Sequence, residues 1–270
     1  MNEILPDKNN FFKDGYCVLR NFLTKDEVEK YSLLAKNFRE KNKHMRTSGL
    51  HNYKEFWDII VNDRLLNALK NLLGPDILYL YNSHIEENNE TATECGWHRD
   101  NTTRIFGKGP DWDPKEDYNV IRVGFYLSSF DTCKSGINII PESHKKNYTF
   151  SQLLRLIFYK TKNIENSFVQ NIRKKLEKYI GISIRTNLGD CVMFLANVYH
   201  APLPASGLRK SLFTTYGTNN KHAKNYNNYY LKHRNYPINN DVHQEFKNLL
   251  KEKNIYISPP EKKEHIEHMT

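Results

Sequence analysis

The sequence predicts a mainly β fold, an antiparallel β-barrel or sandwich with helices at its flanks. Amphipathic helical stretches come first, within residues 24–73, and about eight short β-rich segments follow between residues 77 and 216. Most successive β-rich segments are joined without a helical crossover, which disfavours a βαβ fold. One more helical stretch, at about 150–180, interrupts the strands, and we interpret it as an insertion that packs on the sheet.

The first long helix is predicted to begin at a capping box, with Thr24 as the N-cap and Glu27 three residues further on. It runs to about Phe38, and its apolar face carries Val28, Tyr31 and Leu34 or Ala35. A second helix is predicted from Phe56 to about Leu73, where Gly74-Pro75 ends it. Before both helices, residues 11–20 indicate a helix end, a glycine turn and a short strand.

Strands are predicted where β-branched and aromatic residues cluster between turn residues. They cover Ile77–Ile85, Val120–Leu127, Gly136–Pro141, Ile182–Thr186, Cys191–Phe194 and Leu208–Tyr216. The polar loop at 101–119 is too long for a simple connection, and such loops often close over a site. The tail from Lys221 carries one short predicted helix near Val242–Lys251.

Length and composition limit the class of protein. A chain of 270 residues forms one large domain or two small ones, and its 17 Tyr and 14 Phe argue against global disorder. No apolar run approaches the roughly 20 residues of a membrane span, and the N-terminus lacks a secretion signal pattern. The 4 Cys are scattered without a C-x-x-C motif, which disfavours a zinc cluster and predicts a cytoplasmic location.

The net charge of +9 raises the question of a nucleic-acid partner. The basic residues are dispersed, however, and the chain is rich in Lys, Asn, Ile and Tyr together, as AT-rich coding sequences are. We therefore disfavour a nucleic-acid role. An anionic small substrate is a milder interpretation of the same charge.

His98 and Asp100 stand two positions apart, so their side chains point the same way if the backbone is extended. His200 follows about a hundred residues later. Two histidines and one carboxylate on one face of a metal leave the opposite positions open, which is the ligand set of non-haem Fe(II) oxygenases. In a chain with 11 His and 31 acidic residues the tripeptide also arises by chance, and alone it indicates an ordinary surface histidine.

Further motifs give the tripeptide a context. The segments Phe12–Leu19, Trp97–Asp100, Ser135–His144 and Leu188–Phe194 are followed by His200 and, nine residues on, Arg209. From about Phe11 to Tyr216 this order resembles the phytanoyl-CoA dioxygenase family of Fe(II)- and 2-oxoglutarate-dependent oxygenases, which includes ectoine hydroxylases. Two departures bear on the substrate: Glu142 stands where the family usually has Gly, and Ala201-Pro202 follow His200 where a small pair is common.

The resemblance implies a single domain over 1–270 with a double-stranded β-helix of the jelly-roll, cupin-like type. N-terminal helices, the helical insertion at about 150–180 and a C-terminal extension at about 221–270 surround it. His98, Asp100 and His200 are then the Fe(II) ligands, with O₂ as a reactant and ascorbate as an auxiliary reductant. The distal carboxylate of 2-oxoglutarate binds the planar fork of Arg209. Ser211, on the same strand face, and Asn82 are further candidate contacts of the co-substrate.

The partner implied is a small-molecule substrate, with anionic and carrier-bound molecules among the options. Its candidate contacts are His84, Asn101, Arg104 and Trp112. Arg122 is ambiguous: if Phe125 faces the co-substrate, Arg122 points to the other side.

The resemblance also bears on the outcome of the reaction. Asp100 favours hydroxylation over halogenation, because halogenating relatives keep the carboxylate position small. Desaturation, cyclisation or oxidative cleavage in a biosynthetic pathway are alternative outcomes of the same cofactor chemistry. A non-catalytic metal-binding β-barrel is the alternative from another class, and the intact set of His98, Asp100, His200 and Arg209 argues against it.

Overall fold

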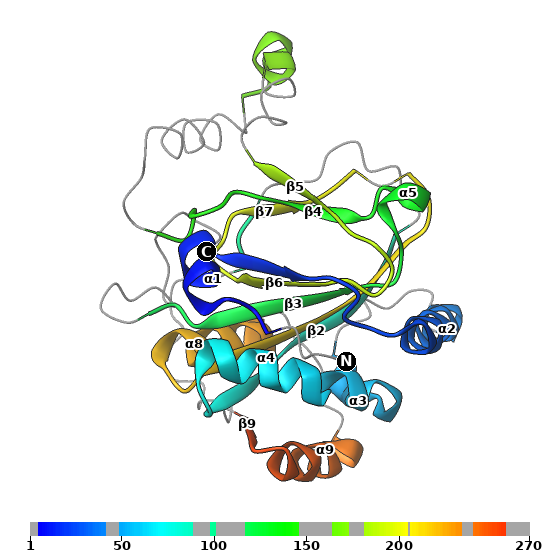
Figure 1. Cartoon of the computed structure of the whole chain (residues 1–270), viewed down its shortest axis with the longest axis vertical. Coiled ribbons are helices and arrows are strands. Elements are labelled where there is room, and N and C mark those ends of the chain that lie inside the picture. The colour runs from blue at the N-terminus through cyan, green and yellow to red at the C-terminus, as the bar shows by residue number, and fades with distance from the viewer. Residues whose placement is uncertain are drawn as a thin grey trace.

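Two facing β-sheets form the centre of the molecule (Figure 1). The structure is a computed structural model that describes residues 5–41, 49–88, 98–100, 117–145, 164–172, 181–204, 206–233 and 240–257. The larger sheet has six strands in the order β1-β6-β3-β8-β2-β9, and the smaller has three in the order β5-β4-β7. The strands are β1 (Tyr16–Leu19), β2 (Ile77–Asn88), β3 (Val120–Tyr126), β4 (Gly136–Ile139), β5 (Ile182–Arg185), β6 (Cys191–Leu195), β7 (His200–Pro202), β8 (Arg209–Thr218) and β9 (Ile255–Ile257).

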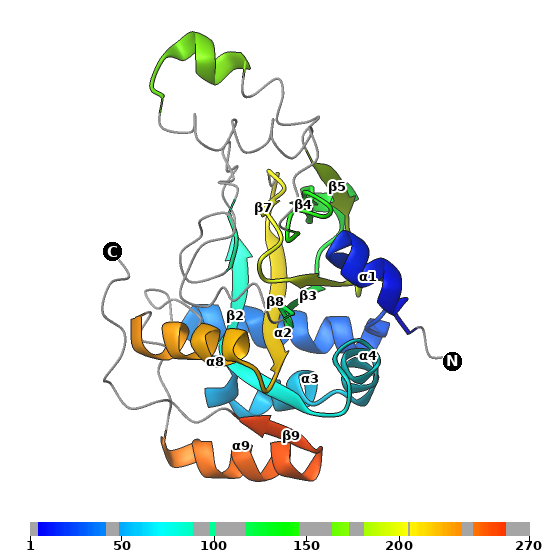
Figure 2. The ribbon, with the colours of Figure 1, turned by 90° about the vertical axis from the view of Figure 1, so that its left-hand side faces the viewer.

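Helices cover the outer face of the larger sheet, on the side away from the smaller one (Figures 1 and 2). They are α2 (Lys25–Lys41), α3 (Trp57–Ile60), α4 (Asp63–Leu73), α8 (Lys221–Asn228) and α9 (Asn240–Glu252). Two short helices, α1 (Lys8–Asp14) and α5 (Phe130–Cys133), and the 3-10 turns at Leu50–Asn52 and Lys54–Phe56 complete the connections. The predicted apolar faces are buried: Val28, Tyr31 and Ala35 on α2, and Leu65, Leu66, Leu69 and Leu72 on α4.

The capping box of α2 is confirmed, since the Thr24 amide donates to the Glu27 carboxylate (2.7 Å) and the Glu27 amide donates to the Thr24 hydroxyl (3.2 Å). The continuous helix predicted from Phe56 to Leu73 is wrong. The helix breaks after Ile60, and the Asn62 side chain accepts from two amides at the start of α4. An apolar periodicity that continues across Asn62 hides this break, although Asn is a favoured N-cap.

All seven residues of β3 are buried, because helices cover one face of the strand and the barrel interior covers the other. Phe125 packs against Phe22, with ring centroids 5.8 Å apart, on the helix side. Arg122 and Tyr126 therefore face the interior between the two sheets. This resolves the ambiguity of Arg122, whose side chain points inward.

An irregularity in β2 falls at Asn82 and removes it from the regular pairing with β8. The register with β8 shifts between Leu80 and His84, so three residues of β2 lie opposite one residue of β8. Before the shift Leu80 pairs with Thr215, and after it His84 pairs with Phe213 and Glu86 with Ser211. The shift leaves His84 and Glu86 facing the interior and separates them from Asn82.

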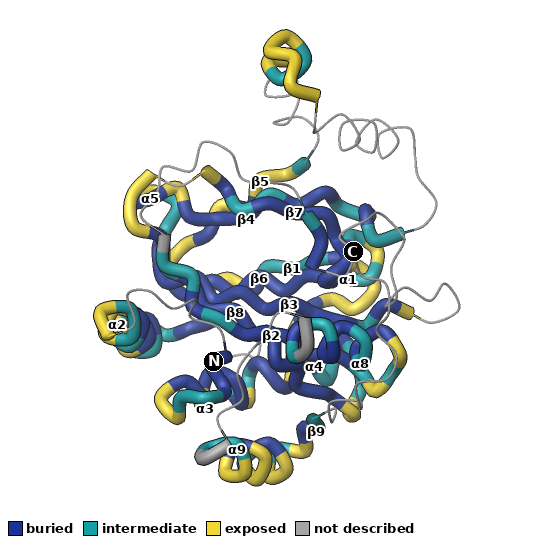
Figure 3. Tube along the Cα trace, turned by 180° about the vertical axis from the view of Figure 1, so that it is seen from behind, coloured by how far each residue is buried: buried dark blue, intermediate teal, exposed yellow. Residues whose placement is uncertain are grey.

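The predicted insertion is described only at residues 164–172, of which 167–172 are helical. This part stands away from both sheets (Figures 2 and 3), and Phe168 is 70% exposed. Packing of the insertion on the sheet is therefore wrong for these residues. The rest of the insertion and most of the 101–119 loop lie outside the described residues.

The chain after Lys221 contains more secondary structure than the one short helix that the sequence predicts. Helix α8 continues into a π-helical turn at Tyr229–His233, α9 confirms the helix near Val242–Lys251, and β9 pairs in parallel with β2. The Asn227 side chain accepts a hydrogen bond from the Tyr81 amide (2.9 Å), which fastens α8 to β2. Among the described residues, no helix has both the length and the apolar character to span a bilayer.

Candidate metal and co-substrate site

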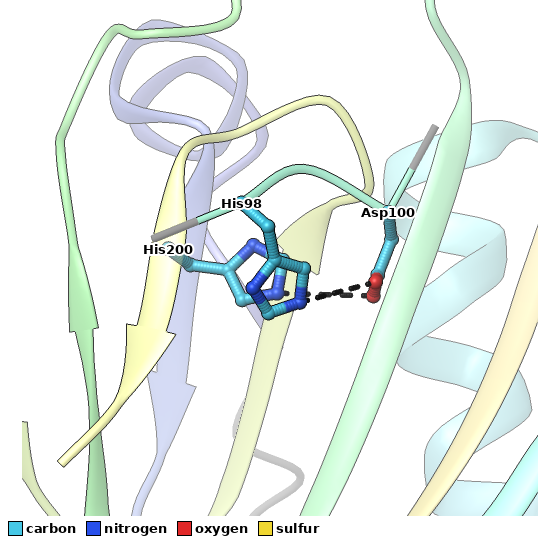
Figure 4. A group of neighbouring side chains, drawn as sticks. All are labelled: His98, Asp100 and His200. Carbon is cyan, nitrogen blue, oxygen red and sulfur yellow. Dashed lines mark ion pairs between the residues drawn. The ribbon is translucent and has the colours of Figure 1, made fainter. Parts of the chain in front are cut away.

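His98, Asp100 and His200 converge between the two sheets, as Figure 4 shows. One ligand atom from each of them lies within 4.8 Å of the other two. Nε2 of His98 is 3.6 Å from Oδ1 of Asp100, and Nε2 of His200 is 3.8 Å from Oδ2. Two imidazole nitrogens and a carboxylate at these separations can hold one divalent transition-metal ion.

Backbone pairing sets this convergence. His98 and His200 form an isolated antiparallel bridge, with amide-to-carbonyl distances of 2.8 and 2.9 Å in the two directions. The Asp100 amide donates to the Ala196 carbonyl at the end of β6 (2.8 Å). The segment 98–100 is thus extended as the His-x-Asp spacing requires, and both of its candidate ligands point to the same side.

Arg99, between the two candidate ligands, points the other way and is 1% exposed. Its guanidinium donates to the Ser143 carbonyl, and the Ser143 hydroxyl accepts from the Tyr199 amide (2.8 Å). Ser143 therefore links the segment of His98 to that of His200. His144 is structural as well: its Nε2–H donates to the Phe12 carbonyl (2.9 Å).

A second hydrogen bond orients His200. Its Nδ1 lies 2.9 Å from the Val198 carbonyl, which can only accept, so the proton sits on Nδ1 and the Nε2 lone pair faces Asp100. Burial, together with nearby His98, lowers the pKa of His200 to about 3. The imidazole is therefore neutral at physiological pH, which is the form that binds a metal.

Asp100 is held as a carboxylate by Arg122. Burial alone would raise the pKa of Asp100, but Arg122 and the two histidines outweigh it and keep that pKa well below its usual range. Nε of Arg122 lies 2.9 Å from Oδ2 of Asp100, so the two side chains form an ion pair. The Nε–H bond is not aligned for a hydrogen bond to that oxygen. Nη1 of Arg122 donates to the backbone carbonyl of Asn82 (2.8 Å) and to the Thr215 hydroxyl (2.7 Å). These contacts fix the guanidinium behind the candidate metal ligand.

Arg209 and Ser211 stand at alternate positions of β8, so their side chains face the same side of the sheet. Arg209 is buried, donates to the Leu203 carbonyl (2.8 Å), and points its second terminal nitrogen at Oε1 of Glu86 (3.0 Å). The Ser211 hydroxyl donates to Oε2 of Glu86 (3.4 Å). Both donors thus already bind a carboxylate, the group that the distal end of 2-oxoglutarate would present, so the residues fit that anion.

The three candidate metal ligands, Arg209 and Glu86 line one pocket, with an empty volume of about 570 Å³ that includes space open to solvent. Its lining includes His84, Glu86, His98, Asp100, Arg122, Tyr126, Phe194, His200, Arg209 and Phe213. Its mixture of charged and aromatic side chains suits a small organic ligand beside a metal. The predicted substrate contact His84 stacks on Phe213, with centroids 5.0 Å apart, and thus lies in the pocket.

The structure does not bring Asn82 into this pocket. The side-chain amide of Asn82 donates to the Tyr226 hydroxyl on α8. Asn82 contacts the site through its backbone carbonyl, which accepts a hydrogen bond from Arg122. Asn101, Arg104 and Trp112 lie outside the described residues. Two residues of the pocket lining do not follow from the sequence: Arg122, whose direction is ambiguous there, and Glu86. Glu86 could have been found, because it lies on the same strand face as His84.

A cupin-type pair of sheets that presents two histidines and one carboxylate to one point defines the class of non-haem metal oxygenases. A family model described as phytanoyl-CoA dioxygenase (PhyH) matches residues 11–209. The chain belongs to this family, and it is an Fe(II)- and 2-oxoglutarate-dependent oxygenase with O₂ as its third reactant. No curated protein sequence matches the chain.

Solved structures confirm the double-stranded β-helix. HygX from Streptomyces hygroscopicus, with nickel and 2-oxoglutarate bound, is 16% identical with a TM-score of 0.61, over 80% of this chain and 88% of that one. EctD from S. alaskensis with bound Fe is 16% identical with a TM-score of 0.56, over 78% and 75%. The non-haem α-ketoglutarate-dependent epimerase SnoN from nogalamycin biosynthesis is 14% identical with a TM-score of 0.53, over 78% and 79%.

Proposed function

We propose that the protein hydroxylates an unactivated C–H bond of a small molecule, with release of succinate and CO₂. His98, Asp100 and His200 bind the iron, and Arg209 with Ser211 binds the distal carboxylate of 2-oxoglutarate. The observation that carries this proposal is the convergence of three ligand atoms within 4.8 Å, in the same pocket as buried Arg209. Iron(II), 2-oxoglutarate and O₂ supply the oxidising chemistry when bound.

The chain's own residues hold and orient the reactants. The Val198 carbonyl keeps the proton of His200 on Nδ1, and Arg122 keeps Asp100 ionised, so neither of these two ligands needs to lose a proton before metal binding. The low pKa of His200 means that protons do not compete with the metal at neutral pH. Phe194 and Phe213 form apolar walls beside the ligands and limit the water around them.

Asp100 supports hydroxylation over halogenation, because its carboxylate occupies the position that a halide would need. A different oxidative outcome is the alternative, since SnoN, with the same fold, is an epimerase. Desaturation, cyclisation and oxidative cleavage start from the same cofactors. Membership of the family argues against a non-catalytic metal-binding β-barrel. A cytoplasmic location stays a prediction.

The test measures succinate formed from 2-oxoglutarate by purified protein with Fe(II), O₂ and ascorbate, alone and with pools of small metabolites. We expect turnover by the wild type, none by His98→Ala, and wild-type turnover by His243→Ala, a histidine on α9 outside the pocket. Hydroxylation gives a product heavier by one oxygen atom, and ¹⁸O₂ labels it. An unchanged mass indicates epimerisation, and a loss of two hydrogens indicates desaturation or cyclisation.

Fe(II) binding to the two variants separates the enzyme from the binding protein. If the wild type binds Fe(II), His98→Ala does not, and no succinate forms with any pool, the non-catalytic metal-binding barrel is correct. If His98→Ala binds Fe(II) as the wild type does, the ligand assignment is wrong.

A further inference from the structure

Glu86 already stands where the co-substrate is expected. Its two carboxylate oxygens meet two different donors, Arg209 at 3.0 Å and Ser211 at 3.4 Å. These are the two groups on β8 to which the distal carboxylate of 2-oxoglutarate is assigned above. A side chain of the protein and the co-substrate thus require the same pair of donors.

Arg209 cannot follow Glu86 to a second position. Its side chain is 4% exposed, it donates to the Leu203 carbonyl at 2.8 Å, and its Nε is buried without a hydrogen-bond partner in the described chain. Glu86 is the more mobile partner, since its side chain is 31% exposed and lines the pocket. When a second carboxylate arrives, Glu86 is therefore the group that leaves.

The charges require an exchange rather than a shared site. Two carboxylates at one guanidinium repel each other, because like charges at hydrogen-bond range destabilise the ionised forms of both. Within the described pocket lining, the other arginine, Arg122, is already paired with Asp100. No cation of that lining is thus left to neutralise Glu86 while 2-oxoglutarate holds Arg209.

We propose that Glu86 is a built-in competitor for the co-substrate's distal carboxylate and so sets the affinity for 2-oxoglutarate. The inference rests on the proposed function, in which Arg209 anchors that carboxylate. A ligand that must displace an occupant binds with an apparent dissociation constant equal to the intrinsic constant divided by the unoccupied fraction of the site. The effect is specific to ligands with a distal carboxylate, because a monocarboxylic 2-oxo acid such as pyruvate reaches the metal without needing Arg209.

The test titrates 2-oxoglutarate into the Mn(II)-loaded protein by isothermal calorimetry, which needs no turnover. Glu86→Gln keeps the shape and removes the charge. We expect it to bind 2-oxoglutarate about tenfold more tightly than the wild type, which corresponds to ~1.4 kcal/mol. Binding of pyruvate should not change. Glu87→Gln is the matched control. The carboxylate of Glu87, the next residue along β2, pairs with Lys210 (3.8 Å) and is absent from the pocket lining.

Thermal unfolding of the same variants controls for folding. Without ligand, Glu86→Gln leaves buried Arg209 without its carboxylate, so its melting temperature should fall, and 2-oxoglutarate should raise it by more than in the wild type. Arg209→Met should abolish 2-oxoglutarate binding in either case.

Two failures are distinguishable. If the wild type binds 2-oxoglutarate, Arg209→Met does not, and Glu86→Gln binds with equal or lower affinity, the competitor proposal is overturned and the proposed function stands. If Arg209→Met binds as well as the wild type, or if neither the wild type nor Glu86→Gln binds, the co-substrate anchor itself is wrong and both proposals fall.

Discussion

At the scale of residues, the candidate site depends on four side chains that converge from three separate segments of the chain. His98, Asp100, His200 and Arg209 could be predicted because each stands in a motif with fixed spacing. The direction of Arg122 could not, because all seven residues of β3 are buried and the strand has no apolar–polar alternation to reveal its inner face. Asn82 was predicted to face the pocket because the register shift in β2 leaves no mark in the residue pattern.

Glu142 shows a cost of departing from the family pattern. Its φ is +61°, in the left-handed region where glycine is favoured, and its amide donates to the Asp14 carbonyl (2.9 Å). Glu142→Gly should therefore stabilise the protein by about 1 kcal/mol in urea unfolding. Asn254→Gly, at φ +55°, is the control and should gain less, because Asn tolerates this conformation. A loss of stability in Glu142→Gly would show that contacts of the Glu142 side chain outweigh the strain.

His144 predicts an acid-sensitive stability. Burial is the main cause that lowers the pKa of His144 to about 4, below the usual 6.5. Between those two values the unfolded chain binds the proton and the folded chain does not, so stability falls as the pH drops from 6.5 to 4. His144→Gln should remove on the order of 2 kcal/mol of that fall at pH 5. Urea unfolding at pH 7 and 5 measures it, and an unchanged difference between the two would refute the assignment.

At the scale of elements, local signals located most helices and strands, and long-range contacts decided the rest. The capping box at Thr24 and the turn at Gly74-Pro75 fix helix ends through their own residues, and both were predictable. The break at Asn62 was not, since the apolar face of the helix continues across it. Strand β9 is three residues long and exists because β2 offers a free edge in parallel register, which no local pattern encodes.

Glu27 connects two elements, and its loss should cost more than the loss of the cap alone. Besides closing the capping box, its carboxylate accepts from Arg64 of α4 at 2.5 and 2.6 Å. Thr24→Ala should destabilise by about 1 kcal/mol and Glu27→Ala by about 2 kcal/mol in urea unfolding. Glu29→Ala is the control: it removes an exposed ion pair with Lys25 (3.9 Å) and should stay within ~0.5 kcal/mol of the wild type. Equal losses in Thr24→Ala and Glu27→Ala would mean that the Arg64 pair contributes nothing.

At the scale of the whole molecule, the candidate site joins the two sheets. The segment of His98 bridges β7 of the smaller sheet, while Asp100 is held by Arg122 of the larger one. A metal bound there links the two sheets through side chains. The order of motifs along the sequence predicted this arrangement, whereas composition alone predicted only a barrel or a sandwich.

Metal removal should therefore lower the stability of the whole domain. Mn(II) with 2-oxoglutarate, each at about one hundred times its dissociation constant, should stabilise the fold by at least ~2.7 kcal/mol and raise the melting temperature by about 5 °C. Excess EDTA should reverse the rise. His98→Ala should melt near the metal-free wild type and show no rise. A full rise in that variant would exclude His98 as a ligand.

The position of β1 at the outer edge of the larger sheet bears on how the protein is made. Strand β1 pairs only with β6 within the described sheet, and roughly 170 residues separate the two in the chain. At about 5–20 residues per second, the ribosome releases the partner of β1 some 10–30 s after β1 itself. During this interval the nascent chain carries an unpaired strand, a natural target for chaperones. Because His200 is translated after β6, iron can be captured only once almost the whole β-helix has left the ribosome.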